Sequence, residues 1–509
     1  MSNARLRSLT ETLSHIQRSL TDRLPITGGV EFLILVLLTF TILAHINLFT
    51  IRVPRDAGAF LTIADGILEG QLPYREYVDH KPPGIYYTLA AVLVIDRSVE
   101  TARTLLLVTN VATSALLVTV ARNCWSRDVG LLAALLYLAA LPLYQGVFLL
   151  TEPFLALALV ATVVMLSRYV EHRDLKFAAA AGFAIGAALL FKQVALAGLP
   201  IFAVAIVILP AVHDNRLALP ISYHYLRPLV PLAIGFAVPL LITSGYFIAN
   251  DSIGELLFWT TTANVGYGIM SPTRTLKLII ERVGLATELW LIAAISTGLL
   301  LTVAKREWAV WGAVFTALLV ATAVPLIVHQ FHHYFITMLP FVVLLTAGGI
   351  FVAGEWLAER FELSSVVTRR GLIIGVLVIT SPIIGPTAIN TVTVPGGDGT
   401  LADQRVLADR IAMETDPNEP IVLLSAEPQF YFLADRRPMG RNVYYLPINR
   451  GISYTDAGLA RRIASTRPPV VIIRDCRTLS RSCMVVRDQY LGPDDYHRGL
   501  RYWRDSESP

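Results

Sequence analysis

The residues of this sequence that could do chemistry are a few ionisable side chains set among long apolar runs. Ionisable groups are costly at or within membrane-spanning segments, so each one found there is a candidate functional site. Some of them follow the first apolar segment, and the others lie beside later apolar runs. They are Asp56, Asp79, His80, Lys81, Glu152, Lys192, His329, His332 and His333.

The three histidines have the spacing i, i+3 and i+4, in the stretch "HQFHHYF". This spacing puts side chains on one face of a helix and suits a metal ion. Packing of His and Tyr at a membrane interface explains the same pattern. A bound divalent cation at His329, His332 and His333 is therefore one of two interpretations.

The other candidates also have simpler explanations. Asp56 could pair with Arg52 or Arg55 on the surface. Glu152 could serve as the cap of the helix that starts at "TEP", and Lys192 could extend its ammonium group to the lipid headgroups. The joint pattern favours function over these explanations, because two acids and two lysines fall on the same side of the membrane in the topology that follows.

The composition predicts a polytopic α-helical membrane protein. Of the 509 residues, 54% are hydrophobic and only 16% are charged, which is rare for a soluble protein of this size. The net charge of +4 is small and spread over many loops, so no nucleic-acid partner is expected. The first apolar run, 32–44, has no small-residue cleavage site after it and is expected to stay as a span.

The apolar runs predict about eleven membrane-spanning helices, each near the length that crosses about 30 Å of hydrocarbon. The run 85–95 is too short to span before Asp96 and Arg97, and is expected to lie at the outer surface as a juxtamembrane helix. The spans are predicted near 31–50, 103–121, 129–148, 153–170, 177–191, 194–211, 228–249, 287–304, 308–328, 334–354 and 372–390.

Lys and Arg side chains set the predicted orientation. With the run 85–95 outside, they gather in segment 1–30 and in the loops on the same side of the membrane, whereas the short connections on the other side hold only Lys192. Cytoplasmic loops carry such an excess of positive charge. We therefore expect a multi-pass plasma-membrane protein with a cytoplasmic N-terminus and an extracytoplasmic C-terminus.

The amino-acid composition of the chain changes near residue 395. The runs "NEPIVLLS" and "PPVVIIRD" predict short buried strands in a small α/β domain. Cys476 and Cys483 in this domain could form a disulfide outside the cytoplasm, or remain two free thiols. The predicted organisation is a cytoplasmic segment 1–30, a transmembrane domain 31–394 with a first outer loop 51–102, and an extracytoplasmic domain 395–509.

The first outer loop resembles that of the GT-C class of integral membrane glycosyltransferases, in the branch with the aminoarabinose lipid A transferases and the protein O-mannosyltransferases. "RDAGAFLTIADGILEG" and "DHKPPGIYY" match an early acid at Asp56 and a Lys-Pro-Pro element at 81–83. Weaker matches over roughly 30–350 are "LLTEPFLAL" with Glu152, "FKQVALAGLP" with Lys192, and "HHYFITMLPF" with Tyr334.

This resemblance implies an enzyme that moves a hexose or pentose, with inversion, from a polyprenyl- or dolichyl-phosphate donor to a glycan, lipid or protein acceptor on the outer face. It implies that Asp56 is the base or orients the acceptor, that Glu152 positions the acceptor or a cation, and that Lys81 binds the donor phosphate. The other substrate-binding residues it implies are Asp79, His80, Lys192, His332, His333 and Tyr334.

The sequence departs from the family pattern in two places. Asp56 is followed by Ala57, where a second acid often stands, and the Trp-Trp-Asp element of the oligosaccharyltransferase catalytic subunits is not found. The second departure argues against transfer of a whole oligosaccharide to asparagine. The alternative functions are a secondary transporter or lipid flippase, which also places charges near broken helices, and a non-catalytic scaffold for another transferase.

Overall fold

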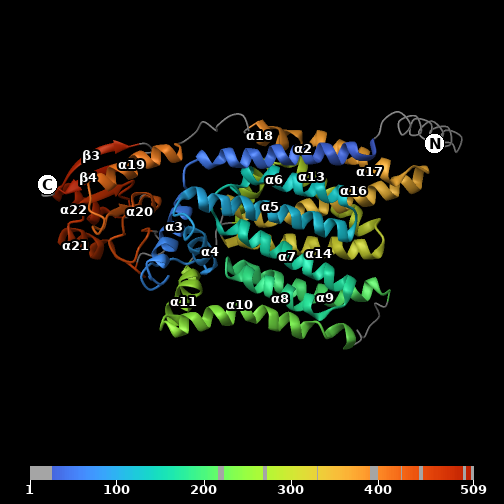
Figure 1. Ribbon diagram of the computed structural model, residues 1–509, viewed down its shortest axis with the longest axis horizontal. Helices are drawn as coiled ribbons and strands as arrows, with labels where there is room; N and C mark the ends of the chain where they lie inside the picture. Colours follow the sequence, from blue (N-terminus) through green and yellow to red (C-terminus); the bar gives the residue numbers. More distant parts are fainter. Residues whose placement is uncertain are drawn as a thin grey trace.

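The computed structural model combines a bundle of long helices with a small α/β domain at one end of that bundle (Figure 1). Helix α2 starts at the end of the bundle that is opposite to this domain. The structure describes residues 26–215, 223–266, 272–328, 331–389, 399–425, 427–445, 451–477, 479–496 and 500–505.

Each of the predicted spans coincides with a helix of the bundle. Among the described residues, 8 helices are long and apolar enough to cross a membrane, or up to 10 if each bent helix pair counts as one span. Helix α8 is shorter than these, and α13 and α17 each belong to a bent pair. The helices that coincide with the predicted spans are α2 (Ile26–Asn47), α5 (Val99–Cys124), α6 (Arg127–Ala140), α7 (Thr151–His172), α8 (Leu175–Leu189), α9 (Leu199–His213), α10 (Leu229–Ala249), α13 (Thr287–Thr302), α14 (Arg306–Ala323), α16 (Phe335–Phe361) and α17 (Ser365–Ile379).

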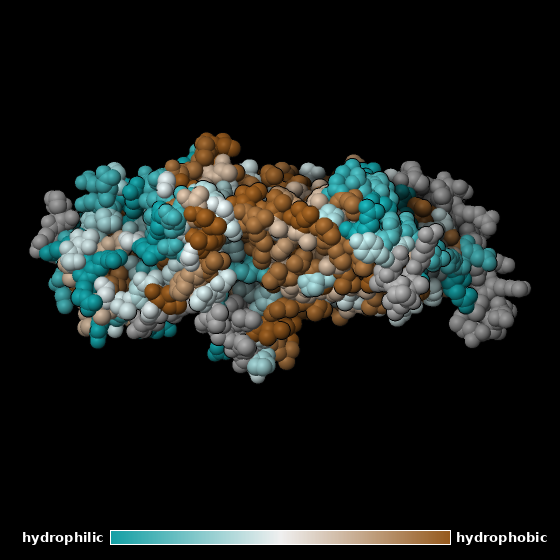
Figure 2. Space-filling model, turned by 90° about the horizontal axis from the view of Figure 1, so that it is seen from below, coloured by the Kyte–Doolittle hydropathy of each residue, from teal (hydrophilic) through white to brown (hydrophobic). Residues whose placement is uncertain are grey.

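The outer surface of the bundle carries a hydrophobic band, with hydrophilic residues on both sides of it (Figure 2). Exposed apolar side chains such as Phe32, Ile234 and Leu241 belong to α2 and α10. So much exposed apolar surface is unfavourable for a monomer in water, but it is favourable in contact with lipid. The prediction of a helical membrane protein is therefore confirmed.

Helix α16 lies at the centre of the bundle. It packs against α6, α7, α13, α14 and α17, and the apolar window of its span is 100% buried. A helix that is hydrophobic on all sides has to be surrounded by other helices or lipid. The segment His332–Tyr334, which carries two candidate residues, is the short 3-10 helix η6 that leads directly into α16.

The first outer loop forms two helices at the end of the bundle, α3 (Arg55–Leu68) and α4 (Gly84–Leu93). Helix α4 has 10 residues, too few to cross a bilayer, as the sequence predicted for the run 85–95. It begins directly after Pro82-Pro83, because the residue before a proline disfavours the helical conformation.

The C-terminal part is a four-stranded sheet in the order β1-β2-β4-β3, with helices around it. The two predicted strands are β1 (Val422–Leu424) and β2 (Val470–Ile473), which are parallel and fully buried. The hairpin β3 (Tyr490–Tyr496) and β4 (Leu500–Asp505) adds to β2 in antiparallel fashion. The helices are α19 (Leu401–Met413), α20 (Gln429–Ala434), α21 (Asp456–Thr466) and α22 (Ser480–Gln489).

Cys476 and Cys483 form a disulfide at the start of α22, with their Cα atoms 6.0 Å apart. Of the two alternatives that the sequence left open, the structure therefore has the bridge. The third cysteine, Cys124, is free and lies at the end of α5.

The α/β domain is docked directly on the first outer loop. Helix α3 packs on α20 so closely that a Cβ atom on Gly58 would lie 2.3 Å from the backbone nitrogen of Gln429. Gln404 of α19 accepts a hydrogen bond from the backbone N–H of Val53 and donates one to its carbonyl, at 2.7 and 3.0 Å. The loop and the domain consequently share one hydrophobic core.

Candidate active site

A buried ion pair lies at the centre of the site. Lys192, which directly precedes the 3-10 helix η3 (Gln193–Gly198), donates a short hydrogen bond to the carboxylate of Glu152 in the first turn of α7. The exposed fractions of the two residues are only 6% and 2%. Such a pair persists away from water because each charge neutralises the other.

Two residues of the segment before α16 complete this cluster. The Nε2 atom of His333 lies 3.7 Å from the Oε1 atom of Glu152. The Nζ atom of Lys192 lies 3.7 Å from the centroid of the Tyr334 ring, which is a cation–π contact. Four residues that the resemblance singled out, from three separate segments of the chain, are thus in mutual contact.

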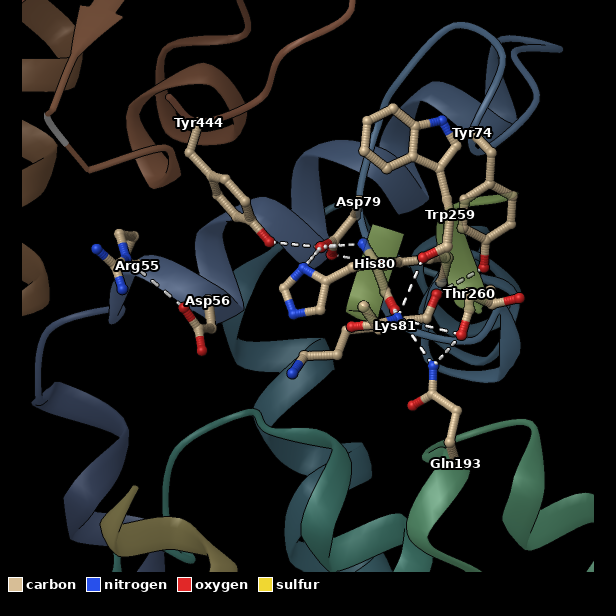
Figure 3. A network of polar contacts seen from close by, with 12 residues as sticks. Arg55, Asp56, Tyr74, Asp79, His80, Lys81, Gln193, Trp259, Thr260 and Tyr444 are labelled. Atoms are coloured by element: carbon tan, nitrogen blue, oxygen red, sulfur yellow. Dashed lines mark hydrogen bonds and ion pairs between the residues drawn. The ribbon is translucent and has the colours of Figure 1, made fainter. Parts of the chain in front are cut away.

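Lys81 and Asp56 bring the first outer loop to the same cluster. The charge of Lys81 acts on Glu152, Lys192 and His333. The charge of Asp56 acts on Lys192 and His333. In Figure 3 the side chain of Lys81 extends toward Asp56 and away from Gln193. The two acids and two lysines of the sequence prediction therefore converge.

Asp56 differs from Glu152 in its surroundings. It lies in the first turn of α3, its side chain is 34% exposed, and the Nε atom of Arg55 is 3.6 Å from its Oδ1 atom. The surface pairing with Arg55 is thus present, but an exposed pair of this kind contributes little. Asp56 keeps an accessible carboxylate, whereas the carboxylate of Glu152 is shared between Lys192 and His333.

The backbone around Lys81 is held from two sides. The Tyr74 hydroxyl donates to the Lys81 carbonyl at 2.7 Å. The N–H of Gly84 donates to the Leu190 carbonyl at 2.8 Å, and a Cβ atom on Gly84 would lie 2.6 Å from that oxygen. Only glycine permits this approach. The Lys-Pro-Pro-Gly turn is therefore packed against the segment that carries Lys192.

Asp79 and His80 directly precede Lys81 in the chain, and Asp79 contacts the α/β domain. The Asp79 carboxylate is buried and accepts hydrogen bonds from the hydroxyls of Tyr86 and Tyr444, both at 2.6 Å. Burial alone would raise its pKa, but the adjacent His80 and the two hydroxyl donors lower the pKa to about 2. The His80 carbonyl accepts hydrogen bonds from Gln193 and Asn264.

His332 and His333 contact different partners. His333 faces Glu152, whereas the Nε2 atom of His332 is 3.2 Å from the Nη2 atom of Arg282 in α12 (Pro272–Gly284). His329 lies outside the described residues. Within the described part of the chain, no group of three or more His, Cys, Asp or Glu side chains could hold a metal ion. The helical spacing predicted one face for three histidines, of which the structure describes two, both in the short 3-10 helix η6.

Sequence reasoning missed several residues that the structure places at the site. Tyr444 comes from the distant α/β domain, Asn264 belongs to no motif, and Gln193 lies in "FKQVALAGLP", where only Lys192 was singled out. Arg282 was missed because it belongs to an amphipathic helix, bent by 99° relative to α13, that looked like a loop between spans. No local pattern in the sequence links Gln193 or Asn264 to His80, because these contacts form only in the folded chain.

Part of the sequence and the fold as a whole are similar to those of known proteins. The family model of dolichyl-phosphate-mannose-protein mannosyltransferases matches residues 80–242. The crystal structure of ArnT from Cupriavidus metallidurans bound to undecaprenyl phosphate matches with a TM-score of 0.61 and 13% identity, over 94% of this chain and 99% of that chain. No curated protein matches the sequence.

A second kind of structure has the same fold. The Archaeoglobus fulgidus oligosaccharyltransferase tethered with an acceptor peptide matches with a TM-score of 0.56 and 12% identity, over 94% of this chain and 75% of that chain. The same archaeal enzyme in complex with an inhibitory peptide and a dolichol-phosphate matches with a TM-score of 0.53 and 12% identity, over 94% and 74% of the two chains.

These matches define the class of fold. The protein has the fold of the GT-C membrane glycosyltransferases, with ArnT and the archaeal oligosaccharyltransferase among the similar structures. Within that class it resembles the branch of ArnT and the protein mannosyltransferases, as its first outer loop indicated.

Proposed function

We propose that this protein is a membrane glycosyltransferase that moves one sugar from a polyprenyl-phosphate donor to an acceptor hydroxyl on the outer face of the membrane. The observation that carries the proposal is the convergence of Asp56 and Lys81 on the buried pair of Glu152 and Lys192. This convergence lies at the end of the apolar bundle, where a lipid phosphate would meet a polar acceptor.

The two acids suit different roles. Asp56 is accessible, so it can take the proton of the acceptor hydroxyl as a general base. Glu152 is buried and lies against Lys192 and His333, which makes it the group that orients these two side chains. With this division of roles, no second acid is needed directly after Asp56, because Glu152 supplies the carboxylate that holds Lys192.

Sugar transfer forms one bond at the anomeric carbon and breaks another. The acceptor oxygen loses its proton to Asp56 and forms a bond to the anomeric carbon of the sugar. The bond between that carbon and the phosphate oxygen breaks, and the phosphate leaves with the bonding electrons. Lys81 stabilises the negative charge that develops on this phosphate, because an ammonium group acts on it as a point charge. Attack opposite to the leaving group inverts the anomeric carbon.

Donor dependence and the role of Lys81 are tested together. Purified protein in vesicles is given undecaprenyl phosphate carrying a radiolabelled hexose or pentose, with solubilised native membranes as the source of acceptor. Lys81→Ala is expected to bind the donor more weakly and to transfer at least tenfold more slowly, because the phosphate loses its counter-ion. Lys176→Ala, an exposed lysine that pairs with Asp174, is the matched control.

The alternatives give different results in this assay. A transporter or flippase would move labelled donor across the vesicle membrane without releasing undecaprenyl phosphate. A scaffold would show no release with purified protein. Equal release by Lys81→Ala and by wild type would remove Lys81 from the chemistry.

The orientation is a second part of the proposal. The start of α2 and the α/β domain lie at opposite ends of the bundle, and the predicted cytoplasmic loops are rich in Lys and Arg. We expect a reporter fused at residue 125 to be cytoplasmic and a reporter fused at residue 505 to be outside. Fusions that report the same side would contradict this topology, and residue 173 provides a second cytoplasmic control position.

A further inference from the structure

A segment of the α/β domain runs alongside the first outer loop next to the proposed site. The N–H of Val78 donates to the Arg441 carbonyl at 2.9 Å, and the Arg441 guanidinium donates to the Tyr74 carbonyl at 2.5 Å. Val78 and Asn442 form a parallel β-bridge. One backbone hydrogen bond, one isolated β-bridge and the Arg441 side chain therefore hold this segment against the first outer loop.

Two residues beyond this bridge, the side chain of Tyr444 reaches Asp79. Its hydroxyl donates to the Oδ1 atom of Asp79, while the Tyr86 hydroxyl donates to the Oδ2 atom (Figure 3 shows Tyr444 and Asp79). The backbone N–H of His80 also donates to the Asp79 carboxylate, at 2.7 Å. Asp79 is only 1% exposed, so this carboxylate faces hydrogen-bond donors and not substrate.

Only His80 separates Asp79 from Lys81 in the chain. Asp79 fixes the backbone of His80 from one side, and the Tyr74 hydroxyl fixes the Lys81 carbonyl from the other. Tyr74 is itself fully buried and is contacted by Arg441. The position of the Lys81 ammonium group thus depends on the docked α/β domain.

We propose that the α/β domain is a positioning domain, and that Tyr444 is a positioning residue that acts through Asp79 on Lys81. The proposal rests on the proposed function where it assigns Lys81 to the donor phosphate. The proposal gives the α/β domain a task that neither the family match nor the fold assigns, because the family match ends at residue 242.

The test compares two neighbouring tyrosines. Tyr444→Phe removes the hydroxyl that contacts Asp79. Tyr445→Phe also removes a hydroxyl, but from a ring that packs on Tyr454, 5.1 Å between centroids. Sugar transfer from labelled undecaprenyl phosphate is expected to fall roughly tenfold in Tyr444→Phe, the loss expected for one hydrogen bond to a charged group. Transfer by Tyr445→Phe should be unchanged.

A double mutant separates positioning from a general loss of stability. In the Lys81→Ala background, Tyr444→Phe is expected to cost nothing further, because the group that it positions is gone. A purely structural role would slow both backgrounds by the same factor, and that result would overturn the proposal.

A second measurement does not depend on transfer. Lys81 is partly exposed, so its rate of modification by an amine reagent in detergent-solubilised protein can be followed by mass spectrometry. We expect Lys81 to be modified several-fold faster in Tyr444→Phe than in wild type or Tyr445→Phe, with Lys176 as the internal reference. Equal rates would overturn the positioning role. If wild type transfers no sugar, the proposed function fails, but this measurement still decides the positioning role.

Discussion

Asp56→Asn is expected to lower the rate of sugar transfer by about 10²–10⁴-fold, the usual cost of losing a general base. The substitution keeps the size of the side chain and part of its hydrogen bonding, and Asp56 is accessible at the start of α3. We therefore expect normal folding and normal donor binding, with the loss confined to transfer at saturating donor.

The measurement is release of undecaprenyl phosphate by purified protein in lipid vesicles at matched protein concentration. Asp488→Asn, which changes an exposed acid on α22, is the matched control and should transfer at the wild-type rate. A near-normal rate for Asp56→Asn would exclude Asp56 as the base, and Glu152 would become the next candidate.

Lys192→Met is expected to destabilise the protein by about 3–5 kcal/mol and to abolish transfer. The substitution leaves the Glu152 carboxylate buried without its main partner, and an uncompensated buried charge is strongly destabilising. A large drop in the thermal unfolding temperature of the purified protein would report this loss. Lys176→Met, at an exposed lysine, should unfold like wild type.

The double variant Glu152→Gln with Lys192→Met separates stability from function. Replacing both members of a buried pair removes the unpaired charge, so most of the lost stability should return. Transfer should stay abolished, because the cationic side of the site is gone. Recovery of transfer in the double variant would show that the pair only stabilises the fold.

The family match and the fold match cover different parts of this site. The family model spans 80–242 and so includes Lys81, Glu152 and Lys192, but neither Asp56 nor His333. The structural match to ArnT spans 94% of the chain. Asp56 and His333 therefore join the proposed site through the structure and the motif resemblance, outside the range of the family model.

The sequence by itself determined the membrane class, the positions of the spans and the short helix α4. These features depend on local properties: the length of apolar runs, the Pro82-Pro83 break and the β-branched strands at 422–424 and 470–473. The sequence also marked Asp56, Lys81, Glu152 and Lys192, because a charge beside an apolar run is costly wherever the rest of the chain lies.

Only the tertiary structure decided how these residues are paired. It assigned His333 and not His332 to Glu152, closed the bridge between Cys476 and Cys483, and joined Asp79 to Tyr444. The partners in the Asp79 contact are hundreds of residues apart in the chain, and their contact exists because the α/β domain docks on α3. Such contacts depend on packing across the whole molecule, which no local pattern of residues encodes.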